Sequence, residues 1–227
     1  MIILAIETSG NVASVALEAQ GKIIGEFSIN TNTTHSQTLM PMVQHLLKTC
    51  GICKTDVGLL AVSSGPGSFT GLRIGAAAAK GLALALSLKI VPVSTLAALA
   101  YNIYQENCLI VPIMDAKRNE VYTALYEFRG DDLICHRAPV ACGFDDVLEA
   151  AKDISKPAIF LGDATYIYAD KIKEAEHKIA PAHRLLQSAA SVAMFAGRNM
   201  QDAINLQEFE ISYIRLSQAE RDMKNDY

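Results

Sequence analysis

The sequence IILAIETSG, from Ile2 to Gly10, is an apolar run that ends in an acidic residue and a turn of small residues. A second run, LIVPIMD, from Leu109 to Asp115, has the same form. A shift of the chain by 108 residues, without a gap, places Glu7 on Asp115 and aligns the strands that follow. We interpret this pattern as an internal duplication, and chance similarity between two hairpins is the alternative.

Each copy predicts the same order of elements. Two further runs follow each acidic turn, over 12–18 and 22–29 in the first half and over 120–128 and 133–140 in the second, and each set predicts a three-stranded antiparallel meander. The other elements expected are helices over 36–50, 70–88, 94–105, 144–152, 166–174 and 188–200, and strands over 57–63, 90–93 and 158–161. We therefore predict two similar α/β lobes, residues 1–107 and 108–227.

Composition narrows the class of protein. Of the 227 residues, 51% are hydrophobic and 19% are charged, which excludes a disordered chain. The net charge is −4 and no stripe of Lys and Arg is present, which argues against a protein that binds nucleic acid by itself. The odd number of cysteines, 5, is not a disulfide framework, so we predict the cytoplasm. Charged residues interrupt the most apolar stretch, 70–104, and no membrane span is expected.

The segment SGPGSFTGLR, from Ser64 to Arg73, joins a predicted strand to a predicted helix. Glycines let a backbone approach a ligand closely, and the start of a helix attracts anions. Gly65, Gly67 and Ser68 are therefore candidate phosphate-binding residues. The segment is neither a Walker A loop nor a dinucleotide fingerprint. The alternative is a tight strand-to-helix turn in which Thr70 caps the helix.

The two duplicated acids are the second candidate site. An acid at the end of a buried strand, followed by a turn of small residues, can hold Mg²⁺ through water and leave backbone N–H groups for phosphates. This makes Glu7, Thr8, Ser9 and Asp115 candidates. The alternative for each turn is an acid that binds its own backbone.

Catalytic and metal sites are not predicted. No histidine has a second ligand at helical spacing, and Cys50 and Cys53 form a lone C-x-x-C without a second pair. No nucleophile–base set can be assigned. The helix over 70–88 is apolar on nearly every side. Such a helix is either covered within its own lobe or packs its small residues against a partner helix.

Several motifs together resemble one family. They are IETS near the start, His35-Ser36-Gln37, SGPGSFTGLR from Ser64, DAKRNEVY from Asp115, and YIRLSQAE from Tyr213. In this order they resemble the TsaB family, also called YeaZ, over residues 2–220. The resemblance implies a bacterial protein with the actin-like ATPase (ASKHA, ribonuclease H-like) fold. That fold has two related lobes, each with a mixed sheet and flanking helices, which agrees with the duplication.

The resemblance also implies a function. It implies a non-catalytic partner of TsaD and TsaE in forming N6-threonylcarbamoyladenosine at position 37 of tRNAs that read ANN codons. Family members pair with TsaD, or with themselves, through the first two helices of the first lobe, and they meet tRNA only through the complex. The interface residues this implies are Leu39, Met42, Val43, Leu46, Leu72, Arg73, Ala76, Ala79 and Lys80.

Two departures from TsaD-like members favour the non-catalytic interpretation. TsaD-like members carry paired metal histidines at the first helix, whereas His35 stands alone. They also carry a Gly-Gly adenosine loop, and the nearest segment here, SAASV from Ser188, has none. We expect no cofactor for the chain by itself, and ATP with Mg²⁺ only within the complex. The alternative function is a stand-alone ATP-dependent enzyme that uses Glu7, Asp115 and residues 65–68.

Overall fold

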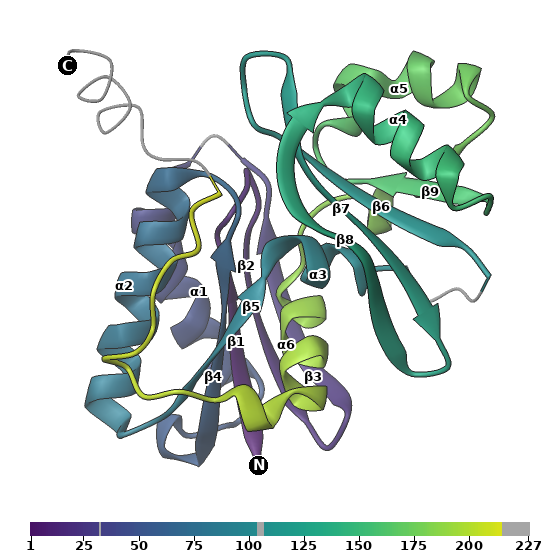
Figure 1. Cartoon of the computed structure of the whole chain (residues 1–227). Helices are drawn as coiled ribbons and strands as arrows, with labels where there is room; N and C mark the ends of the chain where they lie inside the picture. Colours follow the sequence, from purple (N-terminus) through teal and green to yellow (C-terminus); the bar gives the residue numbers. More distant parts are fainter. Residues whose placement is uncertain (32, 104–106, 215–227) are drawn as a thin grey trace.

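The computed structural model shows two α/β lobes, each built on a five-stranded mixed sheet (Figure 1). It describes residues 1–31, 33–103 and 107–214. The first sheet has the order β3-β2-β1-β4-β5, and its strands are β1 (Ile2–Glu7), β2 (Ala13–Ala19), β3 (Lys22–Ile29), β4 (Val57–Gly65) and β5 (Ile90–Ser94). The second sheet has the order β10-β9-β6-β7-β8, and its strands are β6 (Leu109–Asp115), β7 (Glu120–Arg129), β8 (Asp132–Gly143), β9 (Ala158–Leu161) and β10 (Lys178–Ile179).

The duplication is confirmed at the level of topology. In each lobe an antiparallel meander, β1-β2-β3 or β6-β7-β8, lies beside two parallel strands. The ungapped alignment, however, is wrong by one residue. Glu7 pairs with Ser14, whereas Asp115 pairs with Val121, so the second turn is one residue shorter than the first. Three successive residues in the shorter turn, Lys117, Arg118 and Asn119, adopt the left-handed region, with φ of 62°, 59° and 61°.

Helices cover both faces of each sheet. They are α1 (His35–Thr49), α2 (Phe69–Leu86), α3 (Thr95–Ala100), α4 (Phe144–Asp153), α5 (Thr165–Glu174) and α6 (Ala189–Arg198), with short 3₁₀ turns at Lys54–Asp56, Ala182–Arg184 and Met200–Asp202. α1 and α2 cover one face of the first sheet, and α4 and α5 cover the outer face of the second (Figure 1). The helix expected over 94–105 is shorter than predicted, because α3 ends at Ala100, and residues 104–106 lie outside the described residues.

The chain returns to the first lobe after it has built the second. α6 packs its buried face, which includes Val192, against the first sheet (Figure 1). Ile204 then forms an antiparallel bridge with Ile90 at the edge of that sheet, and the Ser212 N–H donates to the Ser64 carbonyl at 2.7 Å. A division into 1–107 and 108–227 therefore does not follow the packing of residues 189–214, although as a statement about domains it stays a prediction.

Candidate functional site

The first acidic turn is sealed inside the first lobe. Glu7 lies at the end of β1 and is fully buried. Its carboxylate accepts hydrogen bonds from the Ser9 N–H at 2.6 Å, from the Ser9 hydroxyl at 2.5 Å, and from the Ser63 hydroxyl of β4. Burial raises the pKa of the Glu7 carboxyl, and these hydrogen bonds oppose the rise. A carboxylate bound in this way belongs to the core and is not open to a water-coordinated cation.

The glycine-rich loop packs against this turn. A Cβ on Gly67 would lie 2.3 Å from the Ser9 carbonyl oxygen, and a Cβ on Gly71 would lie 2.1 Å from the Thr8 carbonyl oxygen. The Thr8 hydroxyl donates to the Gly71 carbonyl at 2.8 Å, and the Ser68 N–H donates to the Ser9 carbonyl at 2.7 Å. The close approach that these glycines permit is therefore to the chain's own backbone.

The start of α2 matches the alternative of a tight strand-to-helix turn, with one correction. Ser68, not Thr70, is the N-cap, and its side chain accepts a hydrogen bond from the Gly71 N–H at 3.2 Å. Gly65 is also needed for close packing, because a Cβ there would lie 2.4 Å from the Ser212 carbonyl oxygen. The loop thus joins three segments of the first lobe.

The segment compared above with an adenosine loop lies at the start of α6, where its backbone donors have partners. The Ala189 N–H donates to the Ser14 hydroxyl at 3.1 Å, and the Ala190 N–H donates to the Glu26 carboxylate at 3.2 Å. The Ser188 hydroxyl donates to the same carboxylate. Together with the sealed Glu7 turn and the packed glycines, this arrangement does not fit ATP and Mg²⁺ in the manner expected from the fold. We therefore derive no chemical step through a nucleotide.

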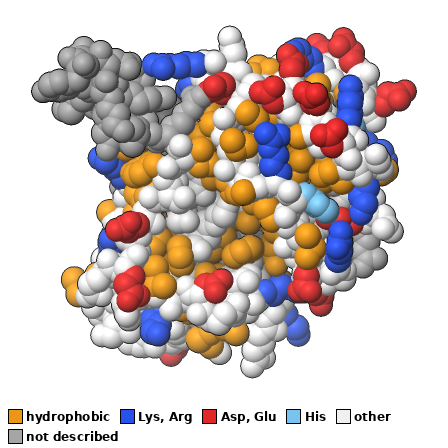
Figure 2. Space-filling model, in the orientation of Figure 1, with side chains coloured by type: hydrophobic (Ala, Val, Ile, Leu, Met, Phe, Trp, Pro, Cys, Tyr) orange, Lys and Arg blue, Asp and Glu red, His pale blue; other side chains and the backbone are white. Residues whose placement is uncertain are grey.

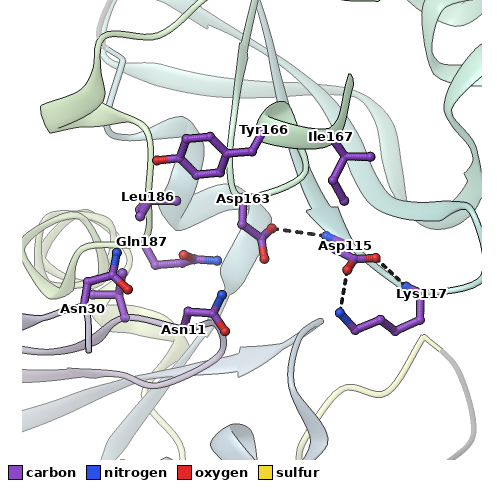
Figure 3. Close-up of a pocket in the computed structure, with 10 residues that line it drawn as sticks. Asn11, Asn30, Asp115, Lys117, Asp163, Tyr166, Ile167, Leu186 and Gln187 are labelled. Carbon is purple, nitrogen blue, oxygen red and sulfur yellow. Dashed lines mark hydrogen bonds and ion pairs between the residues drawn. The ribbon is translucent and has the colours of Figure 1, made fainter. Parts of the chain in front are cut away.

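The second acidic turn, by contrast, lies open at a pocket between the lobes (Figure 3). Asp115 is 24% exposed, and its carboxylate accepts from the Lys117 N–H at 2.7 Å and binds the Lys117 Nζ at 2.6 Å. The pocket holds about 260 Å³. Its lining comes from both lobes: Asn11, Val12, Asn30, Asp115, Lys117, Asp163, Tyr166, Ile167, Leu186 and Gln187. Of the residues predicted to bind a phosphate or Mg²⁺, only Asp115 lines this pocket.

Sequence reasoning missed Asp163, which follows β9. β6 and β9 are parallel neighbours, so their carboxyl ends bring Asp115 and Asp163 together. The Asp115 N–H donates to the Asp163 carboxylate at 3.1 Å. Burial and the nearby Asp115 charge raise the pKa of the Asp163 carboxyl. The signal was available as a Gly162-Asp163 turn directly after a predicted strand, parallel to the one that ends in Asp115.

Metal-binding clusters are not found in the residues that the structure describes, where no three His, Cys, Asp or Glu side chains are grouped. The His35 Nε2 hydrogen-bonds with the Gly10 carbonyl oxygen at 2.8 Å. This hydrogen bond gives the His35 side chain a structural role within the first lobe.

Most of the predicted interface residues lie in the core of the first lobe. Those buried against the first sheet are Leu39, Met42, Val43, Leu46, Ala76 and Ala79, and Leu72 is buried as well. Only Arg73 and Lys80 reach the surface. These buried residues form the inward-facing side of the two helices, and their assignment to a partner interface stays a prediction. The outward faces of α1 and α2 carry different residues, including Met40, which is 45% exposed, and Leu84, which is 72% exposed.

α2 is long and apolar enough to cross a membrane, as its mean hydropathy is 1.3, and 33% of it is buried. Core helices pass the same test of length and composition. Ala79 and Ala83 pack α2 onto its own sheet, which agrees with a lobe helix. Hydrophobic side chains reach the surface on the side of the molecule where α2 lies (Figures 1 and 2).

Comparison with known proteins identifies the family. The model of the family described as "TsaD: tRNA N6-adenosine threonylcarbamoyltransferase" matches residues 22–221. The "tRNA threonylcarbamoyladenosine biosynthesis protein TsaB" of Bacillus subtilis (strain 168) is 33% identical over 231 residues, which cover 97% of this chain and 96% of the relative. The chain belongs to the TsaB family.

Solved structures agree with this membership. "YeaZ from Pseudomonas aeruginosa" superimposes with a TM-score of 0.76 and 25% identity, covering 93% of this chain and 99% of that one. The ROK hexokinase from Thermus thermophilus superimposes with a TM-score of 0.50 and 10% identity, covering 89% and 100%. This second likeness shows the fold alone. The TsaB family and the actin-like α/β fold, both expected from the sequence, are confirmed.

Proposed function

We propose that this chain is the non-catalytic subunit that binds and activates TsaD when N6-threonylcarbamoyladenosine is formed at position 37 of ANN-reading tRNAs. The observation that carries the proposal is the sealed first turn. Glu7 is fully buried and its hydrogen bonds come from the chain's own Ser9 and Ser63. An acid held in this way has no access to a substrate, whereas membership of the TsaB family links the chain to this modification.

The outward face of α1 and α2 is the surface we assign to TsaD. On α2, small residues, Ala77, Gly81 and Ala85, are exposed next to Leu84. On α1, Met40 and Pro41 are exposed. Small side chains allow two helices to approach closely, and exposed apolar residues favour burial against a partner. In the absence of TsaD, the same face would pair two copies of this chain as a homodimer.

The proposal includes three further components of the modification system, namely TsaE, tRNA and ATP with Mg²⁺. TsaE joins the complex, tRNA is bound only through the complex, and ATP with Mg²⁺ belongs to the complex and not to this subunit alone. The net charge of −4 agrees with a subunit that does not bind tRNA directly. We place the complex in the cytoplasm.

The α2 face gives a direct test. Leu84→Glu puts a charge on an exposed position, so the free energy of unfolding should change by no more than about 0.5 kcal/mol. Binding to purified TsaD, measured by calorimetry, and homodimer formation, measured by sedimentation, should both be lost. The matched control is Met200→Glu, because Met200 is also exposed, at 46%, and lies outside α1 and α2. Unchanged TsaD binding by Leu84→Glu would overturn the assignment of this face.

The alternative, a stand-alone ATP-dependent enzyme, predicts ATP hydrolysis by the isolated chain. We expect none above the rate of a boiled sample. Turnover that Asp115→Ala abolishes would contradict the non-catalytic assignment, because that residue is the one predicted acid open to a ligand.

A further inference from the structure

The pocket between the lobes is lined by both polar and apolar side chains. Asp115 and Asp163 supply carboxylates from the ends of β6 and β9, and Asn11 and Gln187 supply amides. Figure 3 shows the Asn11 and Gln187 side chains pointing toward Asp163, with their amide nitrogen atoms leading. Tyr166 and Ile167 of α5 line the same pocket and are 68% and 61% exposed. Donors and acceptors therefore converge on one space.

Gln187 carries a side-chain donor at this pocket whose hydrogen bond is not made. Its side chain is only 5% exposed, and its Nε2 is buried without a hydrogen-bond partner among residues 1–31, 33–103 and 107–214. An unsatisfied buried donor costs about 1–3 kcal/mol. The glycine at position 10 makes room for this amide, because a Cβ there would lie 2.6 Å from Nε2. The buried amide is thus held at the pocket, and the described part of the chain supplies no acceptor for it.

The charged residues of the pocket indicate which group the ligand would carry besides an acceptor for Gln187. Its charged lining residues are Asp115, Asp163 and Lys117, with two negative charges and one positive. Lys117 is 83% exposed and lies on Asp115 as a surface ion pair, which contributes about 0–1 kcal/mol and is easily displaced. Asp163 accepts a backbone N–H from Asp115 and has no lysine or arginine within ion-pair distance among the described residues. The pocket is short of one positive group.

We infer that this pocket binds a small molecule that carries a primary ammonium group beside an oxygen acceptor, as in an amino acid or an amino alcohol. The ammonium would donate to Asp163 and Asp115, and the oxygen would accept from the Gln187 Nε2. A volume of about 260 Å³ lies below the range typical of pockets that bind drug-sized ligands, about 300–1,000 Å³, and suits a small metabolite. This inference goes beyond the proposed function and does not depend on it.

The test titrates the isolated chain, residues 1–227, with three probe molecules and follows binding in NMR spectra. L-Serine and ethanolamine both carry the ammonium and the oxygen, and only L-serine carries a carboxylate. Ethylene glycol has the shape of ethanolamine without the ammonium. We expect saturable binding of L-serine, ethanolamine or both, with shifts confined to residues that line the pocket, and at least tenfold weaker binding of ethylene glycol. Which of the two amines binds distinguishes an amino acid from an amino alcohol as the ligand.

Two variants and a control decide whether the pocket is responsible. Asp163→Asn keeps an oxygen that can accept from the Asp115 N–H, so the fold should persist, and we expect amine binding to weaken by about tenfold or more. Gln187→Leu removes the unpartnered donor and should also weaken binding. Asp145→Asn removes an exposed carboxylate that pairs with Lys171 outside the pocket, and binding should not change.

The inference is overturned if neither amine binds the unaltered chain, or if Asp163→Asn and Asp145→Asn bind equally well. It is also overturned if ethylene glycol binds as tightly as ethanolamine. TsaD is absent from these measurements, so failure of the proposed function would leave their result unchanged.

Discussion

The two acidic turns of the duplication stand at equivalent places in their sheets and have opposite surroundings. Glu7 ends β1, is fully buried, and binds Ser9 and Ser63 of its own lobe. Asp115 ends β6, is 24% exposed, and binds within its own turn at the edge of the interlobe pocket. The repeated topology thus places an acidic residue at the same strand end in both lobes. Whether a ligand can reach that residue depends on the loop that packs against it.

The loop is what differs between the two lobes. In the first lobe the glycine-rich segment at the start of α2 closes over the turn, with its Gly67 and Gly71 against backbone carbonyls. In the second lobe the shorter turn of residues 116–119 leaves Asp115 beside Asp163. Each of the following variants changes one side of this contrast.

The largest effect is expected where the loop touches the first turn. Gly71→Ala places a Cβ 2.1 Å from the Thr8 carbonyl oxygen, and this overpacking should lower the free energy of unfolding by about 3 kcal/mol. Gly81→Ala is the matched control on the same helix, because no atom of the described residues lies within 4 Å of the added Cβ, and it should raise stability by roughly 0.5–1 kcal/mol. Urea unfolding measures both. Equal stability of the two variants would show that the loop does not close on the turn.

Glu7 and Asp115 should also contribute different amounts to the free energy of unfolding. Glu7→Ala leaves the Ser9 N–H and the Ser9 and Ser63 hydroxyls without their acceptor inside the core, which should cost about 2–4 kcal/mol. Asp115→Ala removes a partly exposed ion pair and should cost about 1 kcal/mol or less. Similar losses for both, again measured by urea unfolding, would mean that the turns are equivalent.

A smaller effect follows from pH. The pKa of Glu7 is raised by burial above 4.5, so its contribution to stability is complete below pH 4.5 and is lost as pH rises through the folded pKa. A glutamine does not titrate, so Glu7→Gln does not lose stability in this way. The free energy of unfolding of the variant, relative to that of the unaltered chain, should therefore rise as pH increases above 4.5. Denaturant unfolding at a series of pH values tests this. A difference that stays constant with pH would contradict a buried, perturbed Glu7.

Glu127 of the second lobe should show the opposite dependence of stability on pH. Its carboxylate binds Lys156 and His136, with Arg129 nearby, and these partners lower its pKa to about 2. Its contribution is present above pH 4.5 and is lost as pH falls through about 2. Glu127→Gln should therefore be less stable than the unaltered chain at neutral pH, and this deficit should narrow in acid. A deficit that widens in acid would be the contrary result.

The sequence was sufficient to predict the lobes, because the acid at each strand end marks the duplicated unit and the alternation of runs marks the strands. It could not show that α6 returns to the first sheet, since its apolar face would suit either lobe. Nor could it show what the glycines approach, because a ligand and a backbone carbonyl demand the same missing Cβ at Gly67. Leu39 and Leu46, which the family resemblance assigned to the interface, lie on the face that packs against the chain's own sheet, and a resemblance of motifs does not show which face of a helix turns inward.

The central claim is that Glu7 serves the fold and that neither Glu7 nor Asp115 takes part in the chemistry. The most direct test is the formation of modified adenosine in tRNA by purified TsaD, TsaE and the enzyme that makes the threonylcarbamoyl adenylate. This chain would be absent, unaltered, or carry Glu7→Gln together with Asp115→Asn. We predict no modification without the chain and the full rate with the double variant. Loss of modification by a double variant that still folds and binds TsaD would contradict the claim.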